Sequence, residues 1–233
     1  MNTPIRREGV TLRQAAVIAG LCYLMPVSYA EFAIWPKLIV HGQIAQTVQN
    51  ISLHPRLFAI GILCNLFTLV EDVVIAWAFY ILLAPVNRSL SLLTAWFRLV
   101  YTVIALFAVL NLVTVFHMLT MPGYAGLVAP AQLDAQVFLL LRSFRTDWSF
   151  SLILFGIHLA LLGWLIYQSG YIPRILGGLV ALDGLGWLAA SLQPYLYPGV
   201  DLGFLMPLSF VELLLPIWLL LRGWKIADVE ASA

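Results

Sequence analysis

Runs of about 20 apolar residues recur along this chain of 233 residues, and they restrict what it can fold into. A helix of that length rises ~30 Å, which is the thickness of the hydrocarbon core of a bilayer. The chain is 62% hydrophobic and only 10% charged, whereas soluble domains carry about 25% charged residues. No soluble core could bury so much apolar side chain, so the sequence predicts an all-α, polytopic membrane helix bundle.

We expect six transmembrane helices in a single domain that covers residues 1–233. Their predicted ranges are 14–34, 57–83, 90–118, 148–167, 174–192 and 202–221. The connecting segments 37–55 and 131–144 carry apolar residues at helical spacing, so each is predicted to form a short interfacial helix. No long polar segment remains from which a second domain could be built.

Lysine and arginine residues are distributed unevenly between the two sides of this predicted bundle. One side collects Arg6, Arg7, Arg13, Arg88, Arg174, Arg222 and Lys225, and the other collects Lys37, Arg56, Arg142 and Arg145. Because cytoplasmic loops are the richer in these residues, we expect both termini in the cytoplasm and the chain in a plasma membrane or bacterial inner membrane. The net charge of +1 does not indicate a nucleic-acid partner.

Ionisable residues also lie inside the predicted spans, where each costs about 2.5–3.5 kcal/mol on insertion scales. They are Glu71, Asp72, Arg98, His158, Asp183 and Glu212, with Glu31 near the outer end of the first span. Asp72 lies about 11 residues, or roughly 16 Å, from the inner end of its span. Since most of the others have a similar predicted depth, we expect one polar layer near the middle of the bilayer.

A polar stripe on the second span points toward the third. Asn65, Thr68 and Asp72 share one helical face. The tight connection at 84–88 makes the two spans neighbours, so we expect an ion pair between Asp72 and Arg98. The third span also carries Tyr101 and Asn111.

Each of these residues also has a purely structural interpretation. The pair of Asp72 and Arg98 could serve only to fix helix register. His158 could be a satisfied core histidine, and Asp183, which lies among glycines, could bond to a closely packed neighbouring helix. Glu31 could be partly solvated at the interface.

Carboxyl groups outnumber basic groups in the predicted layer. Glu71, Asp72, Asp183 and Glu212 face one arginine and one histidine. Since four carboxylates cannot all be ionised in a low-dielectric interior without partners, we expect at least one to carry a proton. That arrangement suits acid/base chemistry or proton transfer. Tryptophans in the spans, such as Trp164 and Trp187, could attract cations or could only fill volume.

Motifs that bind metals or cofactors are missing from the sequence. It contains no His-Glu-x-x-His, no Cys-x-x-Cys and no glycine-rich phosphate loop. We therefore predict neither a metal site nor a cofactor.

Two stretches are the most distinctive in the chain: Pro-Val-Asn-Arg at 85–88 and Ser-Gly-Tyr-Ile-Pro-Arg-Ile-Leu-Gly at 169–177. Together with Tyr-Ala-Glu-Phe at 29–32, Glu-Asp-Val at 71–73, Phe-Arg-Leu-Val at 97–100 and Phe-Gly-Ile-His at 155–158, they resemble the bacterial family called domain of unknown function 4386. The resemblance implies a multi-span membrane protein with no settled activity. It matches Asp72, Arg98 and His158 to polar span positions of the family, whereas Asp183 and Glu212 match no motif of it.

The carboxyl excess favours an intramembrane enzyme that acts on a lipophilic small molecule in contact with membrane lipid. The concrete form is protonation-driven cyclisation or isomerisation of an isoprenoid-like chain. Asp72 or Glu71 would be the acid, and Glu212 or Asp183 the base or cation stabiliser. The supporting or substrate-binding residues would be Arg98, His158, Asn65, Tyr101, Asn111, Glu31, Trp164 and Trp187.

Two alternatives stay open at this point. One is a proton-coupled carrier for a small cationic or amphipathic solute, in which the same layer is the proton relay. Against it, the sequence has no evident repeat and no clearly broken helix, both of which are frequent in carriers. The other is a ligand-sensing membrane protein without catalysis.

Overall fold

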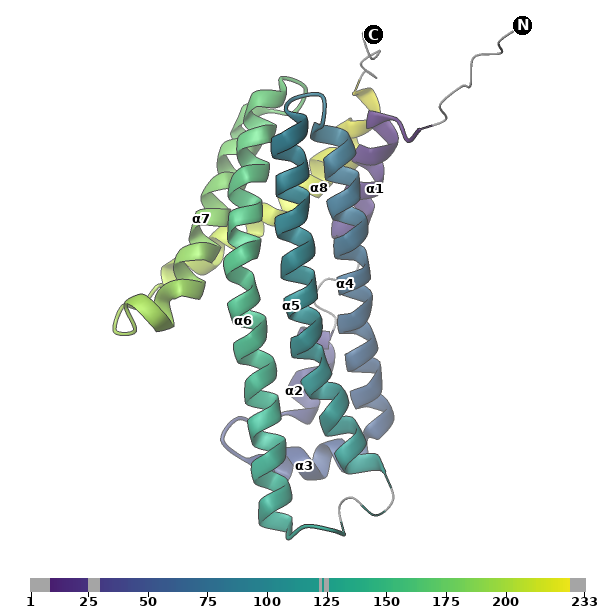
Figure 1. Ribbon diagram of the computed structural model, residues 1–233, viewed down its shortest axis with the longest axis vertical. Coiled ribbons are helices and arrows are strands. Elements are labelled where there is room, and N and C mark those ends of the chain that lie inside the picture. The colour runs from purple at the N-terminus through teal and green to yellow at the C-terminus, as the bar shows by residue number, and fades with distance from the viewer. Residues whose placement is uncertain (1–8, 25–29, 122, 124–125, 227–233) are drawn as a thin grey trace, which may run out of the picture.

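The computed structural model describes residues 9–24, 30–121, 123 and 126–226, and these form a helical bundle (Figure 1). Four long apolar helices, α4 (Pro55–Leu83), α5 (Arg88–Thr120), α6 (Pro130–Ser169) and α7 (Arg174–Leu196), are each able to cross a membrane. A fifth crossing is built from η2 (Gly203–Phe210), α8 (Val211–Arg222) and η3 (Gly223–Lys225). With the shorter apolar helix α1 (Leu12–Leu24), they confirm the predicted all-α membrane bundle.

Proline, asparagine and glycine mark the ends of the long helices. Pro55 and Pro130 occupy the first positions of α4 and α6, where no backbone donor is needed. Asn87 caps α5 by accepting a hydrogen bond from the backbone N–H of Leu90 at 3.0 Å. Gly170 ends α6 in the left-handed conformation, with φ of 74°. The short connections that result make α4 and α5, and likewise α6 and α7, antiparallel neighbours.

Helices α6 and α7 touch through glycines. A Cβ atom added to Gly156 would lie 2.7 Å from the carbonyl oxygen of Gly184, and one added to Gly177 would lie 2.7 Å from that of Gly163. Only glycine allows two helix backbones to approach so closely. The glycines near Asp183 therefore mark close helix packing, as the sequence predicted.

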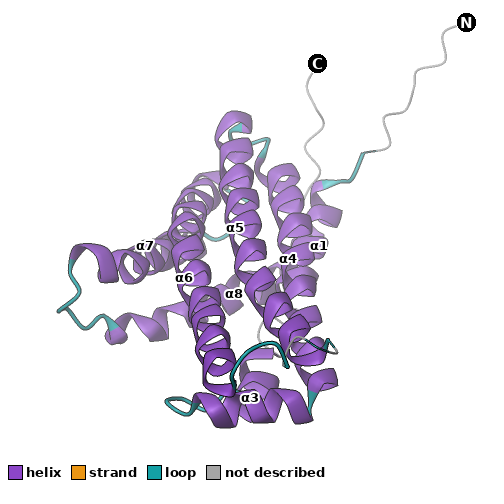
Figure 2. Cartoon of the chain, turned by 60° about the horizontal axis from the view of Figure 1, so that its bottom comes forward, coloured by secondary structure: helices purple, strands orange, loops and turns teal. Residues whose placement is uncertain are grey.

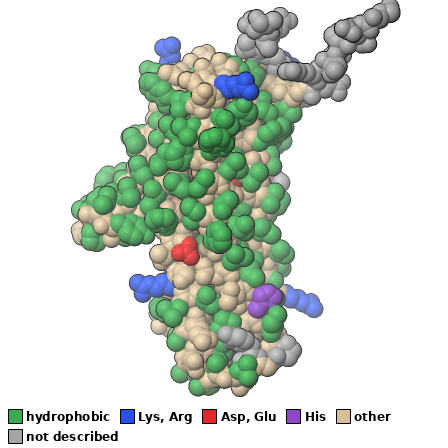
Figure 3. Space-filling model, viewed as in Figure 1, with side chains coloured by type: hydrophobic (Ala, Val, Ile, Leu, Met, Phe, Trp, Pro, Cys, Tyr) green, Lys and Arg blue, Asp and Glu red, His purple; other side chains and the backbone are tan. Residues whose placement is uncertain are grey.

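The bundle has two apolar cores, one above the other in Figure 1. The upper core joins α1 to residues of α4, α5, α6, α7 and α8. The lower core joins the short segments η1 (Ala30–Ile34), α2 (Trp35–Leu38) and α3 (Ile44–Leu53) to the lower ends of α4, α5 and α6. Figure 2 shows α3 lying across that end of the bundle. Apolar side chains cover most of the face seen in Figure 3, with lysine and arginine at its top and in its lower third.

The first predicted span, 14–34, is described in two parts. Helix α1 ends at Leu24, and helical structure is described again from Ala30, through η1 into α2. Residues 25–29 lie outside the described part of the chain. The predicted continuity of the first span falls on these residues.

The segment 131–144, which we expected as a second interfacial helix, is the first part of α6. Its apolar side chains Leu133, Val137 and Leu141 pack into the lower core, and no turn separates it from the span that follows. The other expected interfacial segment, 37–55, does contain a short helix, α3, which buries Thr47 and Ile51.

Candidate functional site

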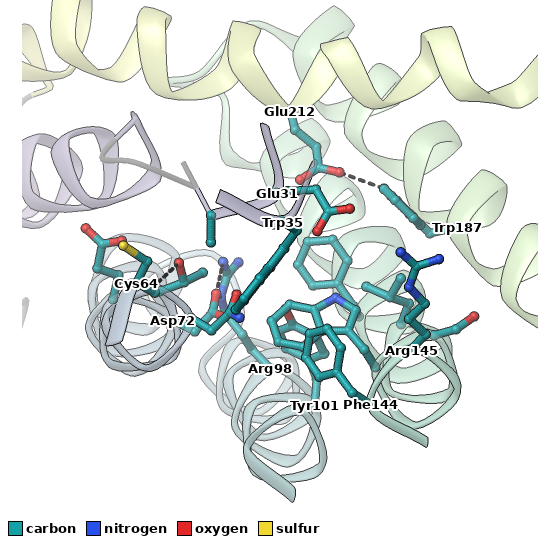
Figure 4. Close-up of a pocket in the computed structure, with 18 of the residues that line it drawn as sticks. Glu31, Trp35, Cys64, Asp72, Arg98, Tyr101, Phe144, Arg145, Trp187 and Glu212 are labelled. Atoms are coloured by element: carbon teal, nitrogen blue, oxygen red, sulfur yellow. Dashed lines mark hydrogen bonds and ion pairs between the residues drawn. The ribbon is translucent and has the colours of Figure 1, made fainter. Parts of the chain in front are cut away.

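A cavity of about 630 Å³ lies between the two cores (Figure 4). Its walls come from α1, η1, α2, α4, α5, α6, α7 and α8. Seven aromatic side chains line it: Tyr23, Trp35, Tyr101, Phe144, Trp148, Phe155 and Trp187. Four carboxylic side chains line it as well: Glu31, Glu71, Asp72 and Glu212. The volume is that of a site for a small organic molecule.

The predicted ion pair between α4 and α5 is present. The Nη2 and Nε atoms of Arg98 donate hydrogen bonds to Oδ1 of Asp72 at 2.5 and 3.0 Å. Both residues are buried, with 3% of Arg98 and 5% of Asp72 exposed. The second carboxylate oxygen, Oδ2, has no hydrogen-bond partner among the described residues. Hydrogen bonds between a guanidinium and a carboxylate are charge-assisted and stronger than neutral ones, so Arg98 and Asp72 form a buried ion pair.

His158 completes this arrangement from α6. Its Nδ1 lies 2.9 Å from the carbonyl oxygen of Thr94, and its Nε2 lies 3.1 Å from Nη1 of Arg98. A carbonyl oxygen only accepts hydrogen bonds and a guanidinium only donates them. Nδ1 therefore carries the hydrogen and Nε2 accepts, which describes a neutral imidazole with both nitrogens engaged. His158 is fully buried and does not line the cavity, so it is a satisfied core histidine that positions Arg98.

The guanidinium group of Arg98 also lies between aromatic rings. Its Cζ atom is 4.9 Å from the centre of the Tyr23 ring and 5.5 Å from that of Phe155. Cation–π contacts of this kind strengthen in a desolvated interior. With Asp72 and His158 they fix the guanidinium from α1, α4 and α6, which makes Arg98 the centre of the polar layer.

A second group of polar side chains joins α7 to α8. The indole N–H of Trp187 donates a hydrogen bond to Oε1 of Glu212 at 2.6 Å. Asp183, one turn before Trp187 on α7, lies close enough to Glu212 to interact with it electrostatically. Asp183 is 2% exposed and does not line the cavity, whereas Glu212 lines it from the first turn of α8. The structure thus brings two carboxyl groups together beside the cavity.

Besides Asp72, two residues of α4 have a buried polar atom without a partner among the described residues. Oε2 of Glu71 and Nδ2 of Asn65 make no hydrogen bond within the described part of the chain, and both residues line the cavity. A buried polar atom without a partner costs about 1–3 kcal/mol. Such atoms are the ones that polar groups of a bound molecule would pair with.

The other predicted site residues divide into two sets. Tyr101 and Glu31 line the cavity. Asn111 and Trp164 do not line it. Asn111 donates a hydrogen bond to Oδ2 of Asp147 at 3.1 Å, and Trp164 is 51% exposed and stacks on Tyr167.

The sequence reasoning missed much of the wall that α6 contributes. Arg145, Trp148, Leu152 and Phe155 line the cavity at spacings of three and four residues, which place them on one helical face. A helix predicted to run on from 131 through 155 would have revealed that face. Within the described residues, no group of three His, Cys, Asp or Glu side chains is placed to hold a metal ion.

The chain is similar in sequence to other proteins. Residues 18–223 match the model of a family described as Domain of unknown function (DUF4386). An uncharacterized protein of Archaeoglobus fulgidus is 32% identical over 186 residues, which cover 78% of this chain and 94% of that relative. No solved structure matches the chain. The family match includes every residue that lines the cavity, and the relative is archaeal, so similar chains are not confined to bacteria.

Proposed function

We propose a function from the cavity itself, because the chain belongs to the DUF4386 family of multi-span membrane proteins, whose name assigns no activity. In this proposal it is an intramembrane acid/base enzyme that exchanges protons with a lipophilic substrate through Glu212 and Glu71. One observation carries the proposal: two carboxyl groups from different helices line one aromatic cavity, and neither has an ion-pair partner among the described residues. Asp72, our first choice of acid from the sequence, is instead given a structural role because Arg98 holds it.

The chemistry can be written as two proton transfers. Glu212 gives its proton to a carbon–carbon double bond of an isoprenoid-like chain, and a carbocation forms on the substrate. The carboxylate of Glu71 then removes a proton from a neighbouring carbon, which leaves an isomerised or cyclised product of the same composition. One proton must pass from Glu71 back to Glu212 before the next turnover.

The surroundings of both carboxyl groups support these roles. Two adjacent carboxyl groups in a dry site share a proton more readily than they both ionise, so Asp183 supports a protonated Glu212. The indole N–H of Trp187 then stabilises the Glu212 carboxylate that the first transfer leaves behind. The rings of Tyr101 and Phe155, at 5.0 Å between centroids, offer π faces to the cationic intermediate.

A carrier is the second candidate, and one observation favours it. The cavity is lined by the π-helix η1 and by the start of α8, where the 3-10 helix η2 changes to an α-helix. Glu31 lies within η1, and Glu212 lies just after the change from η2 to α8. Irregular helical segments at a central site are found in secondary transporters.

Solvent deuterium distinguishes an enzyme from a carrier even while the substrate is unidentified. The purified protein, reconstituted in nanodiscs, is incubated in deuterated buffer with a total lipid extract that includes isoprenoids. An acid/base enzyme introduces deuterium into carbon–hydrogen bonds of one lipid, which mass spectrometry detects. We expect Glu212→Gln and Glu71→Gln each to lower the rate by about 10²–10⁴-fold.

Matched tryptophan variants provide the control. Trp187→Phe removes the donor to Glu212 and should slow incorporation, whereas Trp164→Phe, on the exposed surface, should not. Equal incorporation by the wild type and both glutamine variants would refute the catalytic proposal. Counterflow of a cationic solute in liposomes, without deuterium in any lipid, would support the carrier instead.

A further inference from the structure

A second hollow, of about 750 Å³, lies on the outside of the bundle between the start of α7 and the end of α8. Its floor and walls are apolar: Ile175 and Leu176 come from α7, and Leu214, Ile217, Trp218 and Leu221 come from α8. We call this hollow the α7–α8 groove. Exposed fractions of 72% for Ile175 and 65% for Leu221 show that nothing in the described chain covers it.

Basic residues close one end of the α7–α8 groove. Arg222 and Lys225 line it next to the last turn of α8, and no lining residue is acidic. Leu214 lies eight residues before Arg222, so the apolar wall extends roughly 12 Å along the helix away from these charges. The groove therefore has an apolar wall and a cationic end, which are complementary to the apolar chain and the anionic head of an amphiphile.

We propose that the α7–α8 groove binds an anionic phospholipid, with an acyl chain along α8 and the phosphate between Arg222 and Lys225. The position agrees with that orientation of a lipid, because the groove's basic end lies at the end of the bundle where the helices terminate (Figure 1). Trp224 lies beside Lys225, whose Nζ is 4.9 Å from the ring centre, and its indole N–H bonds to the carbonyl oxygen of Leu221 at 2.9 Å. Tryptophan is the residue that typically anchors a helix at the headgroup level.

Other polar groups nearby are already occupied. The hydroxyl of Tyr171, at the groove's edge, donates a hydrogen bond to the carbonyl oxygen of Leu82. Burial raises the pKa of this phenol, so it remains a neutral donor. Arg174 does not line the groove, and its guanidinium lies 5.8 Å from the ring centre of Tyr167. Recognition of the phosphate thus falls to Arg222 and Lys225.

The test compares phosphatidylglycerol with phosphatidylcholine by native mass spectrometry of the full chain released from detergent. We expect the wild type to retain phosphatidylglycerol preferentially. Removal of both charges in the double variant Arg222→Gln/Lys225→Gln should weaken that binding by about 30-fold and leave phosphatidylcholine unchanged. The double variant Arg88→Gln/Arg174→Gln removes the same charge from the same end of the bundle, outside the groove, and should behave as the wild type.

A fluorescence measurement locates the lipid. Phosphatidylglycerol with brominated chains should quench the emission of Trp218, and the quenching should be smaller in Trp218→Phe. The proposal is overturned if the wild type shows no preference between the lipids, if both double variants lose binding equally, or if Trp218→Phe is quenched as strongly as the wild type. The proposal is also overturned if inorganic phosphate alone protects the protein from thermal unfolding as well as phosphatidylglycerol does.

Discussion

Replacement of Arg98 by methionine tests the central structural claim, that the polar layer is held by an arginine with three polar contacts. The side chain makes two hydrogen bonds to Asp72 and one to His158, and it is 3% exposed. Methionine retains much of the side-chain length and keeps an apolar contact with the rings of Tyr23 and Phe155. It leaves the Asp72 carboxylate in the interior without a counter-charge.

The expected loss in free energy of unfolding follows from these contacts. Removal of one partner from a buried ion pair costs about 3–5 kcal/mol. Loss of the donor to Nε2 of His158 adds about 1 kcal/mol. We therefore expect Arg98→Met to lower the free energy of unfolding by about 4–6 kcal/mol, a large part of the total stability of a typical protein.

The assay is reversible unfolding in mixed micelles with increasing sodium dodecyl sulfate, followed by tryptophan fluorescence. Arg98→Met is compared with Asp72→Leu and with the double variant. Because replacement of a whole buried pair by apolar residues is often close to neutral, the double variant should recover most of the loss. Arg88→Met, at an exposed position, is the control and should change stability by less than about 0.5 kcal/mol.

Two outcomes would refute this reasoning. A loss below about 1 kcal/mol for Arg98→Met would mean that the interior solvates Asp72 without the arginine. Strict additivity of the single variants would mean that the two residues do not interact. If the double variant is stable but no longer introduces deuterium into lipid, the pair also serves the chemistry, and its role is not only to fix the helices.

The same unfolding assay tests two local features, and a fusion experiment tests orientation. Gly163→Ala should lower stability by about 2–3 kcal/mol because its Cβ would lie 2.7 Å from the Cα atom of Ala181, whereas Gly178→Ala, with open space around it, should be neutral or stabilising. Asn87→Ala should cost about 1 kcal/mol through loss of the α5 cap, and an unchanged stability would mean that water replaces it. Green fluorescent protein at the C-terminus should fluoresce in cells, since the charge distribution predicts a cytoplasmic end.

The pairing of Asp72 with Arg98 could be predicted because it depends only on local geometry. The short turn between α4 and α5 makes these helices antiparallel neighbours, so residues at similar distances from the turn meet at similar depth. The burial of Asp183 could also be predicted. A charged residue in a span has few stable surroundings, and this restriction makes its burial predictable.

Side-chain direction could not be predicted from the same information. Asn111 and Trp164 lie on helices that also contribute to the cavity, but on other faces. In a soluble helix, alternation of polar and apolar residues shows which face is buried, whereas in a membrane span nearly every face is apolar. The continuity of α6 was missed for a related reason. Residues 131–144 and 148–167 were predicted as separate helices, although charged residues such as Arg145 occur within regular helices where these extend beyond the hydrocarbon region.

The polar groups around the cavity are of two kinds, which differ in their contribution to the free energy of unfolding. Asp72, Arg98 and His158 satisfy one another, so folding alone can account for them. Glu71 is 6% exposed, and its Oε2 atom has no partner among the described residues. Burial of this unpaired oxygen destabilises the folded state.

Replacement of Glu71 by methionine, which has a similar length, should therefore raise the free energy of unfolding by about 1–3 kcal/mol. The same change should abolish deuterium incorporation, as expected where a site is kept at the expense of stability. A decrease in stability would show that Glu71 has a partner in the membrane that compensates its burial. Its role would then be structural, like that of Asp72, and Glu212 with Asp183 would have to supply both the acid and the base.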